Sequence, residues 1–137
     1  MTIHHTLYRK MTILISTLPE VPEYAKSKVL RFMDLNLDLL SRNDEIITVA
    51  LSHYYEQNGD LIPDPDMVIR INTKTETVEA LTFQDTYVYR EVYLDQNRVD
   101  LKAKKELNEF LLQWLTNLID QGHTLVPIDT ASATTDL

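Results

Sequence analysis

Between residues 18 and 44 the hydrophobic positions recur with the spacing of an α-helix. Pro19 stands where a first helical turn tolerates proline, and the acidic side chains at positions 20 and 23 suit the positive end of a helix dipole. Loop-forming residues follow at 41–44. The pattern predicts a helix from about residue 20 to Leu40, with Asn36 as the place where it could break. Its apolar stripe consists of Val29, Phe32, Met33, Leu37 and Leu40.

The middle of the chain alternates apolar and polar residues, which is the period of a β-strand. β-Branched and aromatic side chains dominate in four runs, at residues 45–55, 67–72, 77–84 and 87–94. Asn58-Gly59 is a strong hairpin signal, because both residues accept positive φ. Pro63 and Pro65 cannot donate a hydrogen bond to a ladder, so the sequence predicts a longer loop between the first two strands.

The most regular pattern is C-terminal. Apolar positions from Leu101 to Ile119 repeat every 3.6 residues, Asp100 can cap the start of this helix, and Gly122 can end it. Short connections make neighbouring strands antiparallel. We therefore expect an α+β fold, with a four-stranded antiparallel sheet and an N-terminal and a C-terminal helix packed on one face.

The length of 137 residues predicts one domain. We place it at residues 21–123, between an N-terminal extension over 1–20 and a flexible, aperiodic tail over 124–137. The sequence contains neither a secretory signal pattern nor an apolar run long enough to cross a bilayer, so no membrane contact and a cytoplasmic location are expected.

The composition excludes several kinds of chemistry. The absence of cysteine rules out disulfides, thiolate nucleophiles and cysteine-ligated zinc. Two glycines are too few for a P-loop or a dinucleotide-binding loop. Neither a nucleophile elbow nor an HExxH motif occurs. The leading interpretation therefore includes no catalytic residue, no cofactor and no bound metal.

The charge balance is strongly acidic. Acidic side chains outnumber basic ones by 21 to 13, and the net charge is −8. Residues 44–95, which hold the predicted strands, carry eleven acidic and three basic side chains. Phosphate contacts require Lys and Arg, so direct nucleic-acid binding is not expected. A basic protein surface would be attracted to this segment instead.

The acidic segment is also rich in tyrosine, which is enriched at binding hot spots. We hypothesise an adaptor or inhibitor domain that binds another protein, in one version by mimicking the charge of a nucleic acid. A simpler alternative is that the tyrosines pack beside one another with their hydroxyls in water. A third possibility is a homodimer that forms through an uncovered sheet face. The predicted partner-binding residues are Tyr55, Asp60, Asp64, Asp66, Tyr87, Tyr89, Glu91 and Tyr93.

Strand pairing predicts a polar cluster of Arg70, Glu79 and Glu91. Arg70 is expected opposite Glu79 on one side, and Glu91 opposite Glu79 on the other, so that the cation separates two carboxylates. Oxygen ligands favour Mg²⁺ or Ca²⁺, and the alternative function is accordingly a metal-dependent hydrolase. The simpler alternative needs no metal: the aspartates belong to an ordinary loop, and Arg70 and Glu79 form a surface ion pair. The hydrolase would use Asp60, Asp64, Asp66, Glu79 and Glu91.

Two of the four histidines lie where they could matter. His53 falls on a predicted strand beside Tyr54 and Tyr55, where we expect a structural role and weigh a general base as the alternative. His123 follows the predicted end of the last helix, where the dipole favours an imidazolium.

Several short motifs resemble the YqiB-like family, small bacterial domains of unknown function. The resemblance covers about residues 30–123 and implies a bacterial cytosolic protein. It carries over no catalytic or binding residue. The motifs are Phe32-Met33-Asp34-Leu35-Asn36-Leu37 up to Leu40, Arg42-Asn43-Asp44, Pro65-Asp66-Met67-Val68-Ile69-Arg70-Ile71, Val78-Glu79-Ala80, Leu107-Asn108-Glu109-Phe110-Leu111-Leu112-Gln113-Trp114-Leu115 and Gly122-His123.

Overall fold

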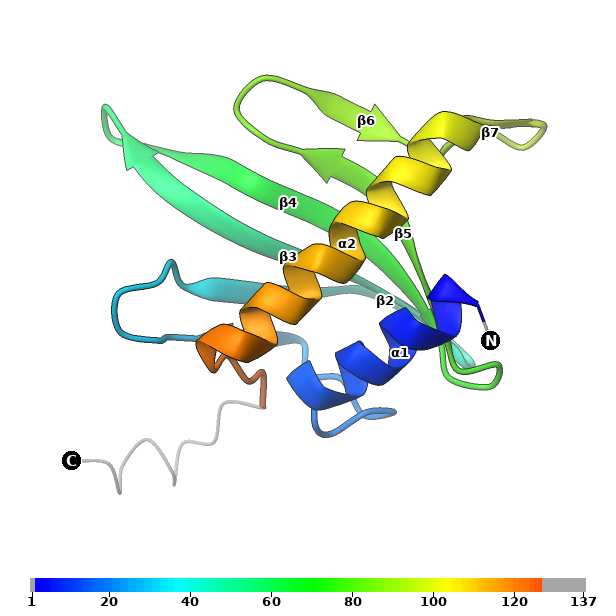
Figure 1. Cartoon of the computed structure of the whole chain (residues 1–137), viewed down its shortest axis with the longest axis horizontal. Coiled ribbons are helices and arrows are strands. Elements are labelled where there is room, and N and C mark those ends of the chain that lie inside the picture. The colour runs from blue at the N-terminus through cyan, green and yellow to red at the C-terminus, as the bar shows by residue number, and fades with distance from the viewer. Residues whose placement is uncertain (1, 127–137) are drawn as a thin grey trace.

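A computed structural model describes residues 2–126 as one antiparallel sheet with two helices (Figure 1). The helices are α1 (Ile3–Leu14) and α2 (Leu101–Gln121). The six strands of the main sheet follow one another in chain order, and each pairs with its neighbour. They are β1 (Tyr24–Ser27), β2 (Leu35–Asn43), β3 (Ile46–Gln57), β4 (Asp60–Asn72), β5 (Thr77–Gln84) and β6 (Tyr89–Glu91). A separate short ribbon pairs β7 (Tyr93–Asp95) with β8 (Arg98–Val99).

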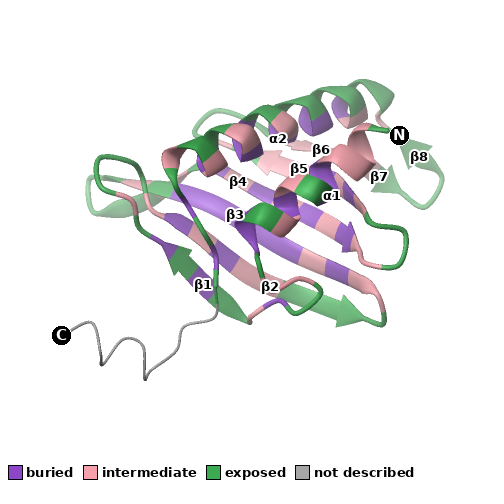
Figure 2. Cartoon of the chain, turned by 60° about the horizontal axis from the view of Figure 1, so that its bottom comes forward, coloured by how far each residue is buried: buried purple, intermediate pink, exposed green. Residues whose placement is uncertain are grey.

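Both helices cover the same face of the sheet, as Figure 2 shows. This inner face is apolar because alternate residues of each strand point to opposite sides. The opposite, outer face is polar and carries no helix among the described residues. The fully buried strand residues of the inner face include Leu35, Leu37, Ile47, Val49, Leu51, Met67, Ile69, Ile71, Val78 and Ala80.

The predicted α+β class with two helices and an antiparallel sheet is confirmed, but the sheet has six strands rather than four. The helix predicted from residue 20 to Leu40 is wrong, because this region forms β1 and β2. Leu35, Leu37 and Leu39 alternate with polar residues, and tertiary pairing selected that period over the helical one. Arg31, with φ of 77°, lies outside helical geometry between the two strands.

The N-terminal helix lies instead at residues 3–14, which we expected to precede the domain. Leu7, Tyr8, Met11 and Leu14 are spaced to share one helix face, and they are buried against the sheet and α2. This short helix was missed because its apolar stripe is surrounded by His, Thr and basic residues. The first helix is therefore part of the hydrophobic core.

The β3–β4 hairpin turns at Asn58 and Gly59, whose φ angles are 54° and 86°. The turn prediction is confirmed, but the longer loop is wrong because Gln57 already pairs with Asp60. Residues 60–65 pair with β3 alone, since pairing with β5 begins at Asp66. One edge of this stretch is therefore free, and a register shift opposite residues 52–54 accommodates the prolines.

Where β6 ends, side chains from the helices cover the free edge of β5. Asn108 Oδ1 of α2 accepts a hydrogen bond of 2.8 Å from the Ala80 N–H. His4 Nδ1 of α1 donates to the Val78 carbonyl at 3.1 Å, because a carbonyl can only accept. These two edge groups are thus occupied and are not available to pair with another strand.

The C-terminal helix agrees with the sequence prediction. Asp100 accepts a hydrogen bond from the Ala103 N–H at 3.0 Å, and Gly122 adopts the left-handed conformation with φ of 97°. Beyond it, Leu125 is buried and donates its N–H to Leu14 O at 2.7 Å. The predicted flexible tail begins at residue 124, and its residues 127–137 lie outside those described.

None of the helices described is both long enough and apolar enough to span a lipid bilayer.

Candidate functional site

The ends of two hairpins project beyond α2 on one side of the molecule (Figure 1). We define the hairpin end as residues 54–66 of β3–β4 and residues 84–89 of β5–β6. A 2.7 Å hydrogen bond between Tyr55 Oη and Thr86 Oγ1 joins the two hairpins. They therefore form one continuous surface.

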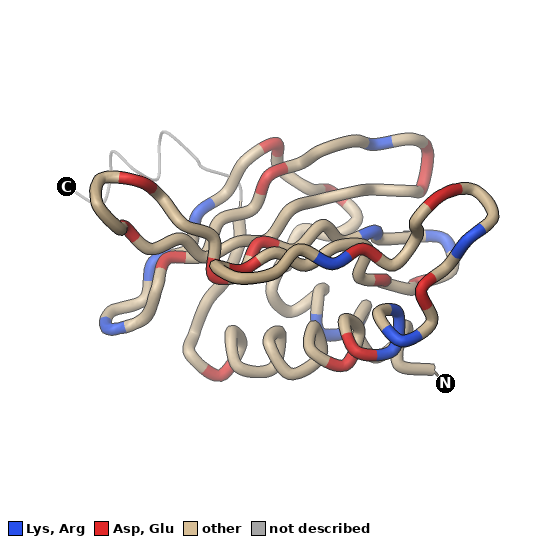
Figure 3. The backbone as a smooth tube through the Cα atoms, turned by 90° about the horizontal axis from the view of Figure 1, so that it is seen from above, with Lys and Arg blue, Asp and Glu red and all other residues tan. Residues whose placement is uncertain are grey.

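The hairpin end carries acidic side chains and no Lys or Arg, so its part of the tube in Figure 3 has red segments and no blue ones. Its carboxylates belong to Glu56, Asp60, Asp64, Asp66 and Asp85. Six of the eight predicted partner-binding residues lie here. These six are Tyr55, Asp60, Asp64, Asp66, Tyr87 and Tyr89.

Two tyrosines of the hairpin end are largely in solvent, with Tyr87 89% and Tyr89 58% exposed. Two carboxylates accept hydrogen bonds from within the hairpin end. Asp66 Oδ2 accepts a 2.9 Å hydrogen bond from the Tyr54 hydroxyl, and Asp85 Oδ1 accepts from the backbone N–H groups of residues 87 and 88. The side-chain carboxylates of Asp60 and Asp64 form no hydrogen bond or ion pair with any residue in the described range. These two carboxylates are free to meet a partner.

The Tyr54–Asp66 contact lies on the outer face of the sheet. Burial and the adjacent Asp66 carboxylate raise the pKa of Tyr54 above its usual value of 10.0. The hydroxyl therefore remains protonated at neutral pH and continues to donate. Asp66 belongs to a row of cross-strand neighbours that runs over all six strands, formed by Lys26, Asn36, Ser52, Asp66, Gln84 and Tyr89.

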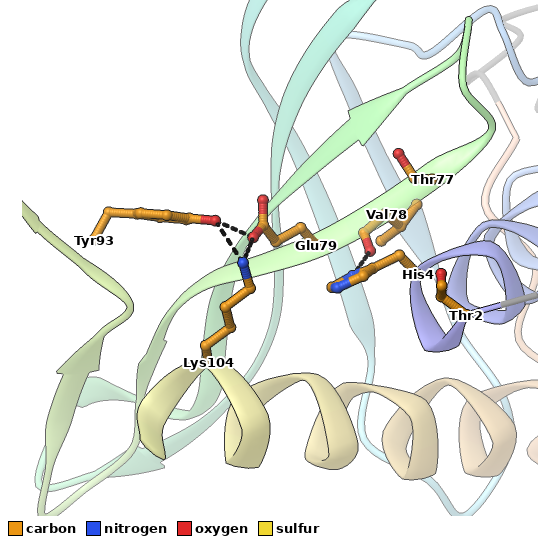
Figure 4. A pocket seen from close by; sticks show the side chains of 7 residues that line it. All are labelled: Thr2, His4, Thr77, Val78, Glu79, Tyr93 and Lys104. Atoms are coloured by element: carbon orange, nitrogen blue, oxygen red, sulfur yellow. Dashed lines mark hydrogen bonds and ion pairs between the residues drawn. The ribbon is translucent and has the colours of Figure 1, made fainter. Parts of the chain in front are cut away.

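A second group of charged side chains surrounds Glu79 near the start of α2. Arg70 Nη2 donates to Glu79 Oε1 at 2.5 Å, and the Tyr93 hydroxyl donates to Glu79 Oε2. Lys104 Nζ lies 3.5 Å from Oε2 and 3.4 Å from the Tyr93 hydroxyl. Figure 4 shows the contacts among Glu79, Tyr93 and Lys104 at one side of a cavity of about 290 Å³. The cavity is lined by Thr2, His4, Thr77, Val78, Glu79, Tyr93 and Lys104.

The protonation states of this group follow from its contacts. Burial alone would raise the pKa of Glu79, but the hydrogen bonds from Tyr93 and Arg70 and the charges of Arg70 and Lys104 lower it overall. Burial and the Glu79 carboxylate raise the pKa of Tyr93. At neutral pH Glu79 is therefore an anion already surrounded by donors, and Tyr93 is neutral. This group is suited to joining the sheet, β7 and α2 rather than to removing a proton from a substrate.

The structure corrects the predicted polar cluster. Arg70 does lie opposite Glu79, as expected. Glu91 does not lie opposite Glu79, because β6 pairs with the other end of β5 and places Glu91 beside Thr82. Sequence reasoning assigned Tyr93 to partner binding and missed Lys104. Only the position of α2 over the sheet brings Lys104 to Glu79, so no local signal could have identified it.

An aromatic pocket of about 450 Å³ lies between α2 and the connection from β1 to β2. Phe110 and Trp114 of α2 form one wall, and Phe32 and Met33 form the other. The remaining lining residues are Arg31, His53, Asp64, Pro65, Asn117 and Gln121. The pocket adjoins the hairpin end through Asp64.

His53 and His123 are both buried at the base of this region. The expected structural role of His53 agrees with its contacts, but its ring packs against Trp114 and His123 rather than against tyrosines. The imidazolium expected for His123 is wrong: burial and the neighbouring His53 lower the pKa of His123. Desolvation disfavours the charged form of a buried ring.

The carboxylates of the proposed hydrolase do not converge. Asp60 is at the hairpin tip, Asp66 is on the outer face, and Glu79 is held by two cations. Within residues 2–126, no three His, Asp or Glu side chains are grouped in a way that could hold a metal ion.

Comparison with known proteins gives one match. A family model described as a domain of unknown function, DUF6908, matches residues 3–124. The match includes α1, and nothing in it connects the chain to the YqiB-like family. No curated protein and no solved structure matches the chain.

Proposed function

The chain belongs to the DUF6908 family, a domain of unknown function, and we propose from its own residues that it binds a basic protein surface through the hairpin end. The observation that supports this function is the combination of five carboxylates, no basic side chain and exposed tyrosines on two joined hairpins. The role is that of an adaptor or inhibitor domain.

The charge pattern favours a protein over a nucleic acid as partner. A phosphate backbone would be repelled by carboxylates that no cation in the hairpin end offsets. A surface rich in Lys and Arg would be attracted over about 10 Å at moderate salt, which speeds association. Tyr87 and Tyr89 can then supply apolar contact area, which charged groups alone do not provide.

The free carboxylates provide the test. The double variant Asp60→Asn/Asp64→Asn removes two charges whose carboxylates form no hydrogen bond or ion pair with other described residues, so the fold is expected to persist. A matched control, Glu109→Gln/Asp120→Asn, removes the same number of charges from α2. The wild-type chain and both variants are immobilised and exposed to a lysate of the source organism at low salt, and the retained protein is then purified.

We expect the purified partner to bind the wild type and the α2 control alike. Its association rate with the hairpin-end variant should fall by about tenfold or more, because steering is lost. Raising the salt from about 0.1 to about 1 M shortens the Debye length from roughly 10 to 3 Å and should release the partner. Equal binding by all three proteins, or binding that salt leaves unchanged, would contradict the proposal.

A further inference from the structure

The aromatic pocket between α2 and the β1–β2 connection exposes large apolar side chains around one cavity. Phe32, Met33 and Phe110 line it and are 47%, 37% and 38% exposed. The ring centroids of Phe110 and Trp114 are 6.1 Å apart, so the two rings form a continuous wall along α2. The volume of about 450 Å³ lies within the range of about 300–1,000 Å³ that small-molecule sites occupy. Apolar side chains left in water around a cavity of this size mark a binding site.

A buried polar atom in this pocket lacks a partner. His53 lines the pocket although it is only 8% exposed. Its Nδ1 donates to the Asp34 carbonyl at 2.8 Å, because a carbonyl can only accept. In the neutral ring Nε2 is therefore an acceptor, and no described residue donates a hydrogen bond to it. The free-energy cost of burying an acceptor without a donor is recovered when a ligand supplies an N–H or O–H group.

The contacts of the His53 ring leave Nε2 open to the pocket. The ring meets Trp114 edge-on, with centroids 5.5 Å apart, and its Nδ1 is turned to the β1–β2 connection. The neighbouring His123 ring differs, because its Nε2 atom is sealed from solvent. Nε2 of His53 is not sealed in this way, so a molecule in the pocket can reach it. His53 thus gives the aromatic pocket one buried hydrogen-bonding group.

The charges at the aromatic pocket favour a neutral ligand. Arg31 and Asp64 line the pocket with opposite signs, and neither forms an ion pair with a described residue. The polar residues that α2 contributes are Asn117 and Gln121, which are uncharged. With a neutral His53 the lining carries no net charge, so no excess of one sign compensates the desolvation of an ionic ligand.

We propose that the aromatic pocket binds a small, neutral, planar aromatic molecule that carries one N–H or O–H donor, as indole and phenol do. Its ring packs between Phe32 on one side and Phe110 and Trp114 on the other, in the offset or edge-on geometries that aromatic groups prefer. Its donor forms a hydrogen bond with His53 Nε2. The site shares Asp64 and Pro65 with the hairpin end, but it does not require the partner proposed for that surface.

The buried acceptor makes the pocket selective. An aliphatic chain or an aromatic ring without a donor can fill the apolar space, but it excludes water and leaves His53 Nε2 unpaired. A site built around a buried polar group rejects analogues that lack the matching group, because the group is then left without a partner. Selectivity for the donor therefore distinguishes this site from a surface that is merely apolar.

NMR titration of the ¹⁵N-labelled chain with indole tests the proposal. Trp114 is the only tryptophan, so its indole N–H gives a single signal that reports pocket binding. At about pH 8, above the ordinary histidine pKa, this signal should shift saturably, with a dissociation constant of about 1 mM or below. The ¹⁵N signal of His53 Nε2 should move upfield, as expected for a nitrogen that accepts a hydrogen bond. Benzothiophene, which has the shape of indole without the N–H, should leave the Nε2 signal in place.

Two substitutions locate the ligand. Phe32→Ala removes an exposed part of the pocket wall and should weaken indole binding about fivefold or more. Leu30→Ala is the matched control, because Leu30 lies on the same connection, is 86% exposed and is outside the pocket lining. It should bind indole as the wild type does.

A third variant isolates the acceptor. His53→Phe keeps a ring beside Trp114 but has no Nε2, so the preference for indole over benzothiophene should fall about tenfold relative to the wild type. If this variant does not fold, the Nε2 signal of the wild type decides the question alone. The absence of a saturable Trp114 shift, equal effects of Phe32→Ala and Leu30→Ala, or an Nε2 signal that both probes move alike would each overturn the proposal.

Discussion

Glu79 is the residue on which the charged contacts near the start of α2 converge. It accepts from Arg70 and Tyr93 and lies 3.5 Å from Lys104 Nζ. Arg70 and Lys104 also lie over the Tyr93 ring, 5.4 and 5.7 Å from its centroid. Removing the carboxylate would leave two cations facing one neutral aromatic ring. This single side chain therefore stabilises the contact between the sheet, β7 and α2.

We predict that Glu79→Gln lowers the free energy of unfolding by about 1–3 kcal/mol, because hydrogen bonds to a charged group are lost. The loss should depend on pH. The pKa of Glu79 is lowered from 4.5 in the folded state, so its contribution is present above pH 4.5 and disappears as the pH falls through the lowered value. Urea denaturation at a series of pH values measures this difference.

Glu109→Gln is the comparison for that experiment. Glu109 pairs with Lys105 at 3.5 Å on the exposed side of α2, where an ion pair contributes little. Its effect should be small at every pH. A difference between wild type and Glu79→Gln that is the same at pH 3 as at pH 7, in roughly the range where carboxylates titrate, would show that the charge of Glu79 is not the cause.

At the scale of the elements, α1 completes the inner layer. Its buried face packs against α2 and β5, and Leu14 O accepts the N–H of Leu125 from the segment after α2. The helix is only 12 residues long, which is marginal for an isolated helix in water. Its stability must therefore come from burial rather than from propensity.

Two substitutions on α1 separate burial from propensity. Leu7→Ala should destabilise the protein by about 2–5 kcal/mol, because Leu7 is fully buried and its removal leaves a cavity. Ile13→Ala lies on the same helix but replaces a side chain that is 55% exposed, so its effect should stay within about 0.5 kcal/mol. Thermal or urea unfolding compares the two. Equal effects would mean that α1 is not part of the cooperative core.

At the scale of the whole molecule, the acidic charge is unevenly distributed. The net charge of −8 is accompanied by six ion pairs among the described residues, none of them in the hairpin end. Like charges gathered on one surface repel one another and oppose folding. A surface that keeps such charges without compensation resembles other functional sites, where stability is reduced for the sake of binding.

Neutralising the free carboxylates should accordingly stabilise the protein slightly. We expect Asp60→Asn/Asp64→Asn to raise Tm by roughly 1–2 °C at low salt. At about 1 M salt, where the Debye length is about 3 Å, the gain should vanish. Calorimetry at the two salt concentrations measures it. A lower Tm in the variant would show that these carboxylates contribute contacts to the fold.

Much of the local structure could be predicted from sequence. The sequence predicted α2 from its helical period, together with the Asp100 cap at its start and Gly122 at its end. It also predicted the Asn58-Gly59 turn and the pairing of Arg70 with Glu79. The region from residue 20 to Leu40 was misread because two apolar patterns overlap there: Leu37 belongs both to a helical stripe with Met33 and Leu40 and to a strand alternation with Leu35 and Leu39. Which period applied depended on pairing with β3, a strand that begins only at Ile46, outside the region itself.

The sequence by itself determined the amount and position of charge, the lack of thiol and glycine-loop chemistry, and the elements whose signals are local. Only the tertiary structure decided that the tips of two hairpins form one acidic surface, that Lys104 reaches Glu79, and that His53 and His123 share a buried site. The physical reason is that charge and turn preference belong to individual residues. Register, burial and the pKa shifts that burial causes belong to neighbours that only folding brings together.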